Sequence, residues 1–173
     1  MLSLLVLGPV LGAAGVRAET PSLRFEGTKY VLVSVDGGEA NVVKNLYVPE
    51  GQAAETATTT IGIRQWPRLK RPTEASKQWE GMIDGRLLRP KQIFKDNSPG
   101  NANSFMVEIW LKGRDADHNE VQLWRFLSEK GSLGVKAYYY TQQVPKDDDT
   151  AYTGRHGSHL RQLADLKVPI QFK

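Results

Sequence analysis

Alternation of apolar and polar residues is clearest in the C-terminal half of the chain, between Phe105 and Gln143. Three segments there are rich in β-branched and aromatic residues, which are typical of strands. Asp in the first connection and Gly in the second suit tight turns. The pattern predicts an antiparallel meander with strands at 105–112, 120–128 and 133–141 and turns at 115–118 and 129–131.

The turns define a register that we can test. They place Glu108 opposite Arg125 and Trp110 opposite Leu123. Because side chains alternate along a strand, Glu108, Arg125, Trp110 and Tyr139 are expected on one face. The two charges have apolar neighbours there, so we expect them to pair, since an unpaired buried charge is costly. A slip of one residue would separate them.

Both faces of this meander are too apolar to be solvated, so each is expected to be covered by further structure. A rival interpretation makes 120–130 a helix, with Asn119 as N-cap and Gly131 just past its end. The apolar residues of that segment would wrap too far round a helix, which favours the strand.

The rest of the chain predicts further strands and two helices. The longer helix, at 73–88, has Thr73 as N-cap and an apolar stripe. The fold class is therefore α+β, a curved antiparallel sheet of about six or seven strands with one main amphipathic helix packed on it. The predicted strands are 22–26, 30–35, 41–48, 58–64 and 168–172, the second helix is 158–166, and the stripe is Ala75, Trp79, Met82, Ile83 and Leu87.

The first 18 residues form an apolar run that ends in small residues, with Val16 and Ala18 at positions that suit signal peptidase. We expect a signal peptide cleaved before Glu19, a single domain at 19–173, and a periplasmic or secreted protein. The run is short and rich in Gly for a spanning helix, so no stable membrane insertion is expected after cleavage. A retained anchor or a buried element are the alternatives.

Composition removes several classes of function. The 173 residues include no Cys and carry a formal net charge of +4, so disulfides, thiol catalysis and Cys-based metal sites are excluded. The excess charge is too small to indicate nucleic-acid binding. Basic residues around Trp66, namely Arg64, Arg68, Lys70 and Arg71, can serve nucleic acid or an anionic glycan, but a solvated connector is the simpler interpretation.

Candidate metal ligands are few. His156 and His159 have a spacing at which two imidazoles can share a metal, but no third ligand is evident, and we expect neither metal nor cofactor. The segment from Asp115 resembles a calcium loop but lacks the required Gly, with Glu120 in its place. Asp147–Asp149 is interpreted as a solvated loop. No hydrolase, nucleotide-binding or metalloprotease motif is present.

The Glu108 and Arg125 pair, walled by Trp110 and Tyr139, is the best candidate ligand site, because such sites combine apolar walls with a few fixed polar groups. A purely structural ion pair is the alternative. We expect an exported, non-catalytic protein that binds a small apolar or anionic ligand or a protein partner. The two competing hypotheses are an exported metal-dependent hydrolase using His156 and His159, and an inhibitor or immunity-type protein.

Overall fold

The structure is a computed structural model that describes residues 20–37, 42–96, 103–128 and 134–172. The predicted signal peptide at 1–18 and the predicted turn at 129–131 lie outside the described residues. Of the helices in the described ranges, none has the length and apolar character needed to cross a membrane.

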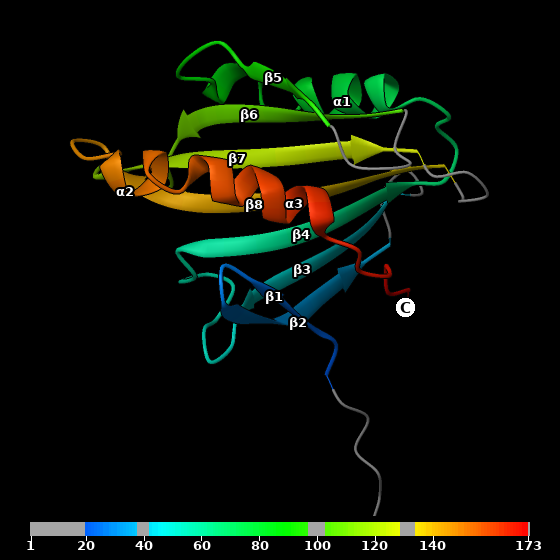
Figure 1. Ribbon diagram of the computed structural model, residues 1–173, viewed down its shortest axis with the longest axis horizontal. Helices are drawn as coiled ribbons and strands as arrows, with labels where there is room; N and C mark the ends of the chain where they lie inside the picture. Colours follow the sequence, from blue (N-terminus) through cyan, green and yellow to red (C-terminus); the bar gives the residue numbers. More distant parts are fainter. Residues whose placement is uncertain (1–19, 38–41, 97–102, 129–133, 173) are drawn as a thin grey trace, which may run out of the picture.

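One open antiparallel sheet of eight strands dominates the fold, in the order β1-β2-β3-β4-β8-β7-β6-β5 (Figure 1). The predicted meander is therefore present, but its last strand also pairs with β4 from the N-terminal half. The strands are β1 (Ser22–Phe25), β2 (Thr28–Asp36), β3 (Val43–Pro49), β4 (Thr59–Trp66), β5 (Gln92–Lys95), β6 (Ser104–Lys112), β7 (His118–Leu127) and β8 (Val135–Pro145).

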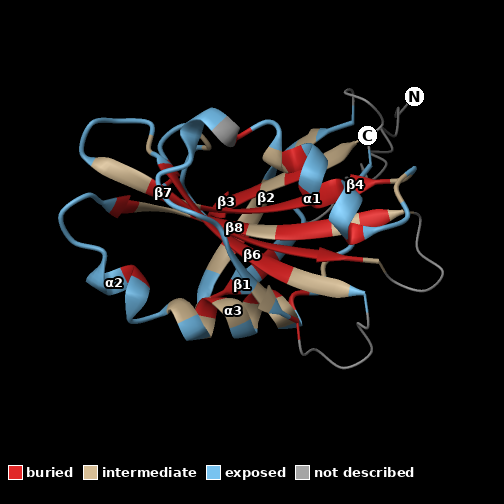
Figure 2. Ribbon diagram, turned by 90° about the horizontal axis from the view of Figure 1, so that it is seen from above, coloured by how far each residue is buried: buried red, intermediate tan, exposed pale blue. Residues whose placement is uncertain are grey.

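Short helices lie on both sides of the sheet (Figure 2). They are α1 (Pro72–Glu80), the 3-10 turn η1 (Asp84–Arg86), α2 (Thr150–Thr153) and α3 (His156–Asp165). Both α1 and α3 pack on the central strands β7 and β8. We name the two sides of the sheet the α1 face and the α3 face after the helix that each carries. Both faces are thus covered, at least in part, as their apolar character predicts.

Each face has its own apolar core, because alternate residues of the same strands point to opposite sides. On the α1 face, Trp79 of α1 packs on Trp124 of β7 with ring centroids 4.4 Å apart. The buried residues of this core are Trp66, Ala75, Trp79, Ile83, Val107, Ile109, Leu111, Trp124, Phe126, Val135 and Ala137. The α3 face buries Ile61, Ile63, Leu123, Leu127, Tyr138 and Tyr140 against Leu163 and Leu166.

The sheet curls strongly around α3. The rings of Phe25 in β1 and Tyr140 in β8 are stacked with centroids 4.8 Å apart. Four strand spacings separate β1 from β8, which would amount to about 19 Å in a flat sheet. A register shift in β2 between Leu32 and Ser34 adds the local twist that a bulge produces. The curvature predicted for the sheet is therefore real.

The predicted registers need two corrections. In the β6–β7 hairpin Glu108 lies opposite Leu123, and Arg125 lies opposite Met106, so the predicted pairing of Glu108 with Arg125 is wrong by two residues. The outermost pair is Lys112 with Asn119, which makes the loop longer than predicted. A shift of two residues keeps side chains on the same face, and both charges still point to the α3 face.

The second hairpin is wrong by three residues, which reverses the face. Arg125 lies opposite Tyr138 instead of Val135, and Tyr139 lies opposite Trp124. Tyr139 therefore belongs to the α1 face, away from the other three predicted site residues. The last pair of this hairpin among the described residues is Leu127 with Lys136.

The helix predicted at 73–88 is shorter and begins earlier. Arg71 is its N-cap and Pro72 its first residue, where a missing N–H costs nothing. Gly81 ends it, and η1 follows after a turn. Consequently Ala75, Trp79 and Ile83 of the predicted stripe are buried, whereas the Met82 side chain is 62 % exposed and Leu87 is 37 % exposed.

Two further differences concern the edges of the sheet. The edge strand β5 was not predicted, because only four residues form it and most are exposed. The segment predicted as a strand at 168–172 does not form one. Asn45 holds it instead: the side-chain amide donates to Gln171 O at 3.0 Å, and Gln171 N donates to Asn45 Oδ1 at 2.7 Å.

Candidate functional site

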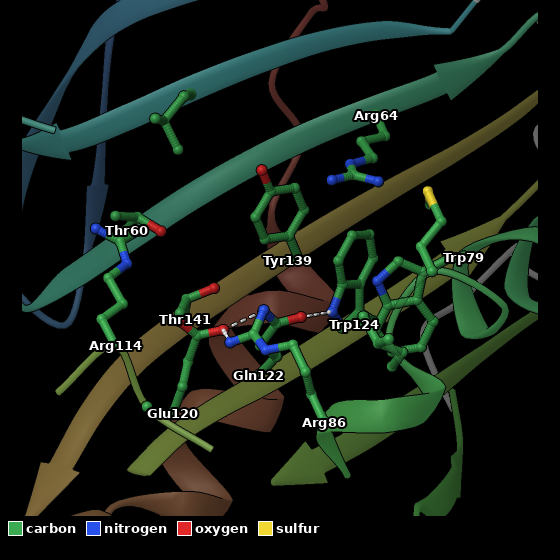
Figure 3. Close-up of a pocket in the computed structure, with 14 residues that line it drawn as sticks. Thr60, Arg64, Trp79, Arg86, Arg114, Glu120, Gln122, Trp124, Tyr139 and Thr141 are labelled. Atoms are coloured by element: carbon green, nitrogen blue, oxygen red, sulfur yellow. Dashed lines mark hydrogen bonds and ion pairs between the residues drawn. The ribbon is translucent and has the colours of Figure 1, made fainter. Parts of the chain in front are cut away.

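The α1 face carries a cavity with a volume of about 780 Å³ (Figure 3). It lies beside α1 and η1, over strands β3, β4, β8 and β7. We name it the arginine groove. Its lining residues are Leu46, Thr60, Arg64, Trp79, Met82, Ile83, Arg86, Gly113, Arg114, Glu120, Gln122, Trp124, Tyr139 and Thr141.

Aromatic rings form the centre of the arginine groove. Tyr139 stacks on Trp124 with ring centroids 4.3 Å apart and planes inclined by 17°. Its ring lies directly over Gly62, where an added Cβ would come within 1.8 Å of the Tyr139 Cζ atom. Gly62 is therefore required for this ring position. Burial raises the pKa of Tyr139, so its hydroxyl stays protonated at neutral pH and can donate a hydrogen bond.

Arg64 projects from β4 into the arginine groove. Its guanidinium carbon lies 5.3 Å from the centroid of the Trp124 ring and 5.7 Å from that of Tyr139, within the range of cation–π attraction. Its Nε is buried and has no hydrogen-bond acceptor in the described part of the chain. A guanidinium presents five N–H donors, so Arg64 keeps donor capacity for a ligand.

Glu120 is the acidic residue of the arginine groove, and its charge is already compensated. Gln122 Nε2 donates to its Oε1 at 2.6 Å and Gln143 Nε2 to its Oε2 at 3.2 Å. The Arg86 guanidinium lies 3.7 Å from Oε1. Gln122 in turn accepts from Trp124 Nε1 at 2.7 Å. The contacts from Glu120 through Gln122 to Trp124 along β7, visible in Figure 3, fix the Trp124 ring.

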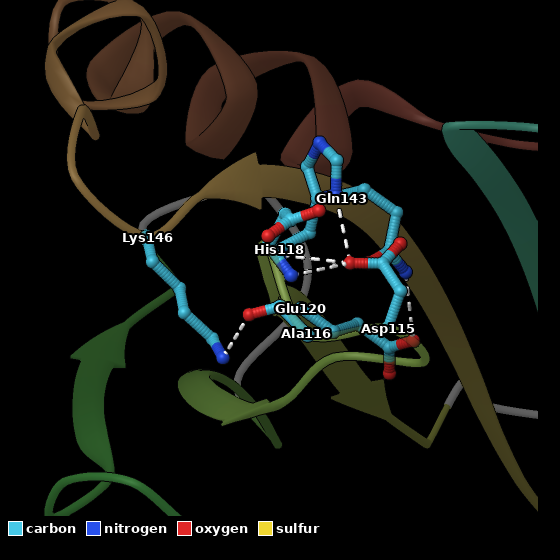
Figure 4. A network of polar contacts seen from close by, with 7 residues as sticks. Asp115, Ala116, His118, Glu120, Gln143 and Lys146 are labelled. Carbon is cyan, nitrogen blue, oxygen red and sulfur yellow. Dashed lines mark hydrogen bonds and ion pairs between the residues drawn. The ribbon is translucent and has the colours of Figure 1, made fainter.

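Arg114 enters the arginine groove from the connection between β6 and β7. One Asp115 Oδ1 accepts hydrogen bonds from the backbone N–H groups of Asp117 and His118, both at 2.9 Å (Figure 4). Lys146 Nζ donates to Ala116 O in the same turn. These contacts make the turn a defined structure, which matches its interpretation as a hairpin connection. Arg114 itself makes one long hydrogen bond, 3.5 Å, to Glu55 O.

The predicted site residues Glu108 and Trp110 meet on the other face, where Glu108 is buried. Its carboxylate accepts hydrogen bonds from Trp110 Nε1 at 2.8 Å, from Tyr152 Oη at 2.8 Å and from Arg89 at 3.4 Å. His156 Nε2 lies 2.7 Å from Glu108 Oε2. These contacts join β6 to α2 and α3, and the Glu108 charge is compensated inside the protein.

Arg125 is 1 % exposed and pairs with Asp96 instead of Glu108, Nε to Oδ2 at 2.8 Å. It also donates to Leu163 O and Leu166 O, both at 3.4 Å, at the end of α3. Carbonyl groups at a helix C-terminus lack intrahelical partners, so the guanidinium satisfies them. The contacts of Arg125 join the sheet to α3, as a structural ion pair would. A ligand role for these residues stays a prediction.

The two candidate metal ligands diverge. His156 contacts Glu108, whereas His159 is buried between aromatic rings, with centroids 4.9 Å from Tyr140 and 5.6 Å from Tyr152. Burial lowers the pKa of His159, because its charged form is desolvated. Within the described ranges no three His, Cys, Asp or Glu side chains are grouped so that they could hold a metal ion.

The arginine groove was not predicted from the sequence. Tyr139 was predicted as a site residue, but as part of the Glu108 and Arg125 site. Three arginines, Arg64, Arg86 and Arg114, come from three separate elements, and no local spacing connects them. The available signal was the polar residues Glu120, Gln122 and Thr141 at inward positions of otherwise apolar strands. Such residues mark the part of a face that no helix covers.

No protein-family model matches the chain, and no curated protein and no solved structure is significantly similar to it.

Proposed function

We propose that the protein is a non-catalytic binding protein whose ligand is a small anion with an apolar part, held in the arginine groove. One observation carries the proposal: the groove presents three arginines and a single, already compensated carboxylate around an aromatic centre. Its volume of about 780 Å³ is in the usual range of ligand sites, about 300–1,000 Å³.

The chemistry of the ligand follows from the lining. Guanidinium groups match the geometry of carboxylates and phosphates and bind them through paired hydrogen bonds. A cleft lined by one sign of charge also concentrates counter-ions. The exposed Met82 and the partly buried ring of Tyr139 supply apolar surface, so an anion that also carries an apolar part would use the whole lining, whereas inorganic phosphate would use only part of it.

The predicted location remains part of the proposal. We place this binding activity in the periplasm or outside the cell, because the apolar run at 1–18 ends in the sequence Val16-Arg17-Ala18. The mass of the mature protein recovered from a bacterial export host tests it: a first residue of Glu19 supports export, and intact Met1 contradicts it.

The binding proposal is tested with 2-naphthoate as the probe and 2-methylnaphthalene as its uncharged counterpart. In 15N–1H NMR spectra we expect 2-naphthoate to shift the indole N–H resonance of Trp124, which borders the arginine groove, and the neutral compound to leave it in place. Arg64→Gln should weaken 2-naphthoate binding by about tenfold or more, the value of a charge-assisted hydrogen bond.

Arg161→Gln is the matched control, because Arg161 is an exposed arginine of α3 on the other face. It removes the same charge from the protein and should leave 2-naphthoate binding unchanged. Equal loss in both variants would mean that only the net charge matters, and the proposal would fail.

A further inference from the structure

The three arginines of the arginine groove differ in whether their charges already have a partner within the protein. Arg86 donates to Lys112 O at 3.1 Å and lies 3.7 Å from Glu120, so its charge has a partner. Arg64 and Arg114 form no ion pair with any residue that the structure describes; Arg114 has only a long contact with a carbonyl oxygen. The groove therefore has two arginines whose charges are open to a ligand.

These two arginines lie at opposite ends of the groove. In Figure 3 they are on either side of Tyr139. Arg114 contacts Glu55 O, in the segment that precedes β4, whereas Arg64 lies near the far end of β4, opposite Ala137. The length of β4 from Thr59 to Arg64 corresponds to about 17 Å. Both side chains line the groove from these positions, so their guanidinium groups are well separated along it.

The surface between the two arginines is uncharged. It consists of Tyr139 and the two buried threonines Thr60 and Thr141, which face each other across β4 and β8. A flat or extended uncharged segment fits over this surface. A negative charge placed in the middle would meet neither guanidinium at close range.

We propose, on the basis of the function proposed above, that the ligand is an elongated dianion with one anionic group at Arg64, the other at Arg114, and an uncharged segment across Tyr139. A ligand with one charge leaves Arg114 uncompensated. A ligand with both charges at one end also leaves Arg114 uncompensated, although its total charge equals that of the elongated dianion.

Three probes separate these cases. 2,6-Naphthalenedicarboxylate carries its carboxylates at opposite ends, 2,3-naphthalenedicarboxylate carries both at one end, and 2-naphthoate carries one. Isothermal titration calorimetry at fixed low salt compares them on the full mature chain. We expect the 2,6-isomer to bind about tenfold tighter than 2-naphthoate, and the 2,3-isomer to stay within a few fold of 2-naphthoate.

The variant Arg114→Gln provides the decisive comparison. It should remove the advantage of the 2,6-isomer, because this isomer should lose more affinity than 2-naphthoate does. Arg64→Gln should weaken all three probes. Arg114 is exposed, and circular dichroism melting checks that the variant is folded.

The outcomes distinguish this inference from the proposal beneath it. If 2-naphthoate binds through Arg64 but the 2,6-isomer gains nothing, the groove is an anion site and the dianion is wrong. Equal affinity of the 2,6- and 2,3-isomers would indicate general electrostatic attraction, and would also overturn it. If none of the three probes binds, both the dianion and the proposed function fail.

Discussion

The two faces of the sheet treat their charged residues in opposite ways. On the α3 face Glu108 and Arg125 are almost fully buried, and each has partners within the protein. On the α1 face Arg64 and Arg114 border a cavity and have no carboxylate partner among the described residues. Charges of the first kind hold elements together, and charges of the second kind remain available for a ligand.

Coverage by helices explains the difference. The segment from α2 to α3 brings a hydroxyl, an imidazole and carbonyl groups onto the α3 face. Helix α1 has nine residues, which span about 14 Å, whereas β7 has ten residues, which span about 33 Å. Helix α1 therefore covers only part of its face, and the arginine groove is the part that it leaves open.

The largest expected effect is the loss of a charge on the α3 face. Arg125→Met should lower the free energy of unfolding by about 3–5 kcal/mol, because Asp96 would stay buried without this guanidinium. Arg64→Met removes the same charge from the α1 face and should cost less than about 1 kcal/mol, the value of its cation–π contacts. Urea denaturation measures both.

A double variant checks the cause. Asp96→Asn in the Arg125→Met background removes the remaining charge and should recover part of the lost stability. If the two single variants at Arg125 and Arg64 were equally stable, the contrast between the faces would be wrong.

A change of intermediate size is expected at the centre of the arginine groove. Gly62→Ala forces the Tyr139 ring away from the sheet, since the new methyl group would overlap it. Overpacking of this kind costs about 1–3 kcal/mol, and 2-naphthoate binding should weaken because the aromatic centre moves. Thermal melting and NMR titration measure the two effects.

Gly157→Ala is the matched control, because Gly157 is an exposed position inside α3 with only an ordinary contact to Arg161. There the same methyl group should be neutral or stabilise by about 0.5–1 kcal/mol. Unchanged binding in Gly62→Ala would show that the ring position does not matter for the ligand.

The smallest effect concerns pH and the α3 face. Burial holds the pKa of His159 below its ordinary value of 6.5. As the pH falls below 6.5, the unfolded chain gains the proton first, so the stability that neutral His159 contributes above that pH is progressively lost. The slope from one group is at most about 1.4 kcal/mol per pH unit.

His159→Phe keeps a ring between Tyr140 and Tyr152 and removes the titration. Denaturation curves at pH 7.5 and 5.0 should therefore differ less for this variant than for the parent protein. His118→Gln, at a half-buried position in the β6–β7 hairpin, is the comparison. If the stability difference between pH 7.5 and 5.0 were the same in His159→Phe as in the parent protein, His159 would not be the source of the pH dependence.

The sequence predicted the strands well because their alternation is local. Positions of the meander in β6 and β7 were sorted to the correct faces, and the burial of Glu108 and Arg125 followed from their apolar neighbours. The helix 158–166 was found within two residues of α3. These features depend on patterns within a few residues of each other, where backbone period and burial are directly linked.

Loops and distant contacts were the source of the errors. A register error of an odd number of residues reverses a face, and this is why Tyr139 was assigned to the side of Arg125. The partner of Arg125 is Asp96, on a segment that was predicted only as a loop. Likewise, no pattern within one element indicates that Arg64 and Arg114 share a cavity, since chain topology alone brings them together.

The strand order has a consequence for how the chain reaches this structure. Among the strands that the structure describes, the first four pair with the last four only where β4 pairs with β8, and that seam joins Thr59 to Gln142. Closing so long a stretch of chain costs entropy before any contact is gained, which slows folding. During synthesis the N-terminal half must wait for β8 to emerge, and both walls of the arginine groove come together only in this late step.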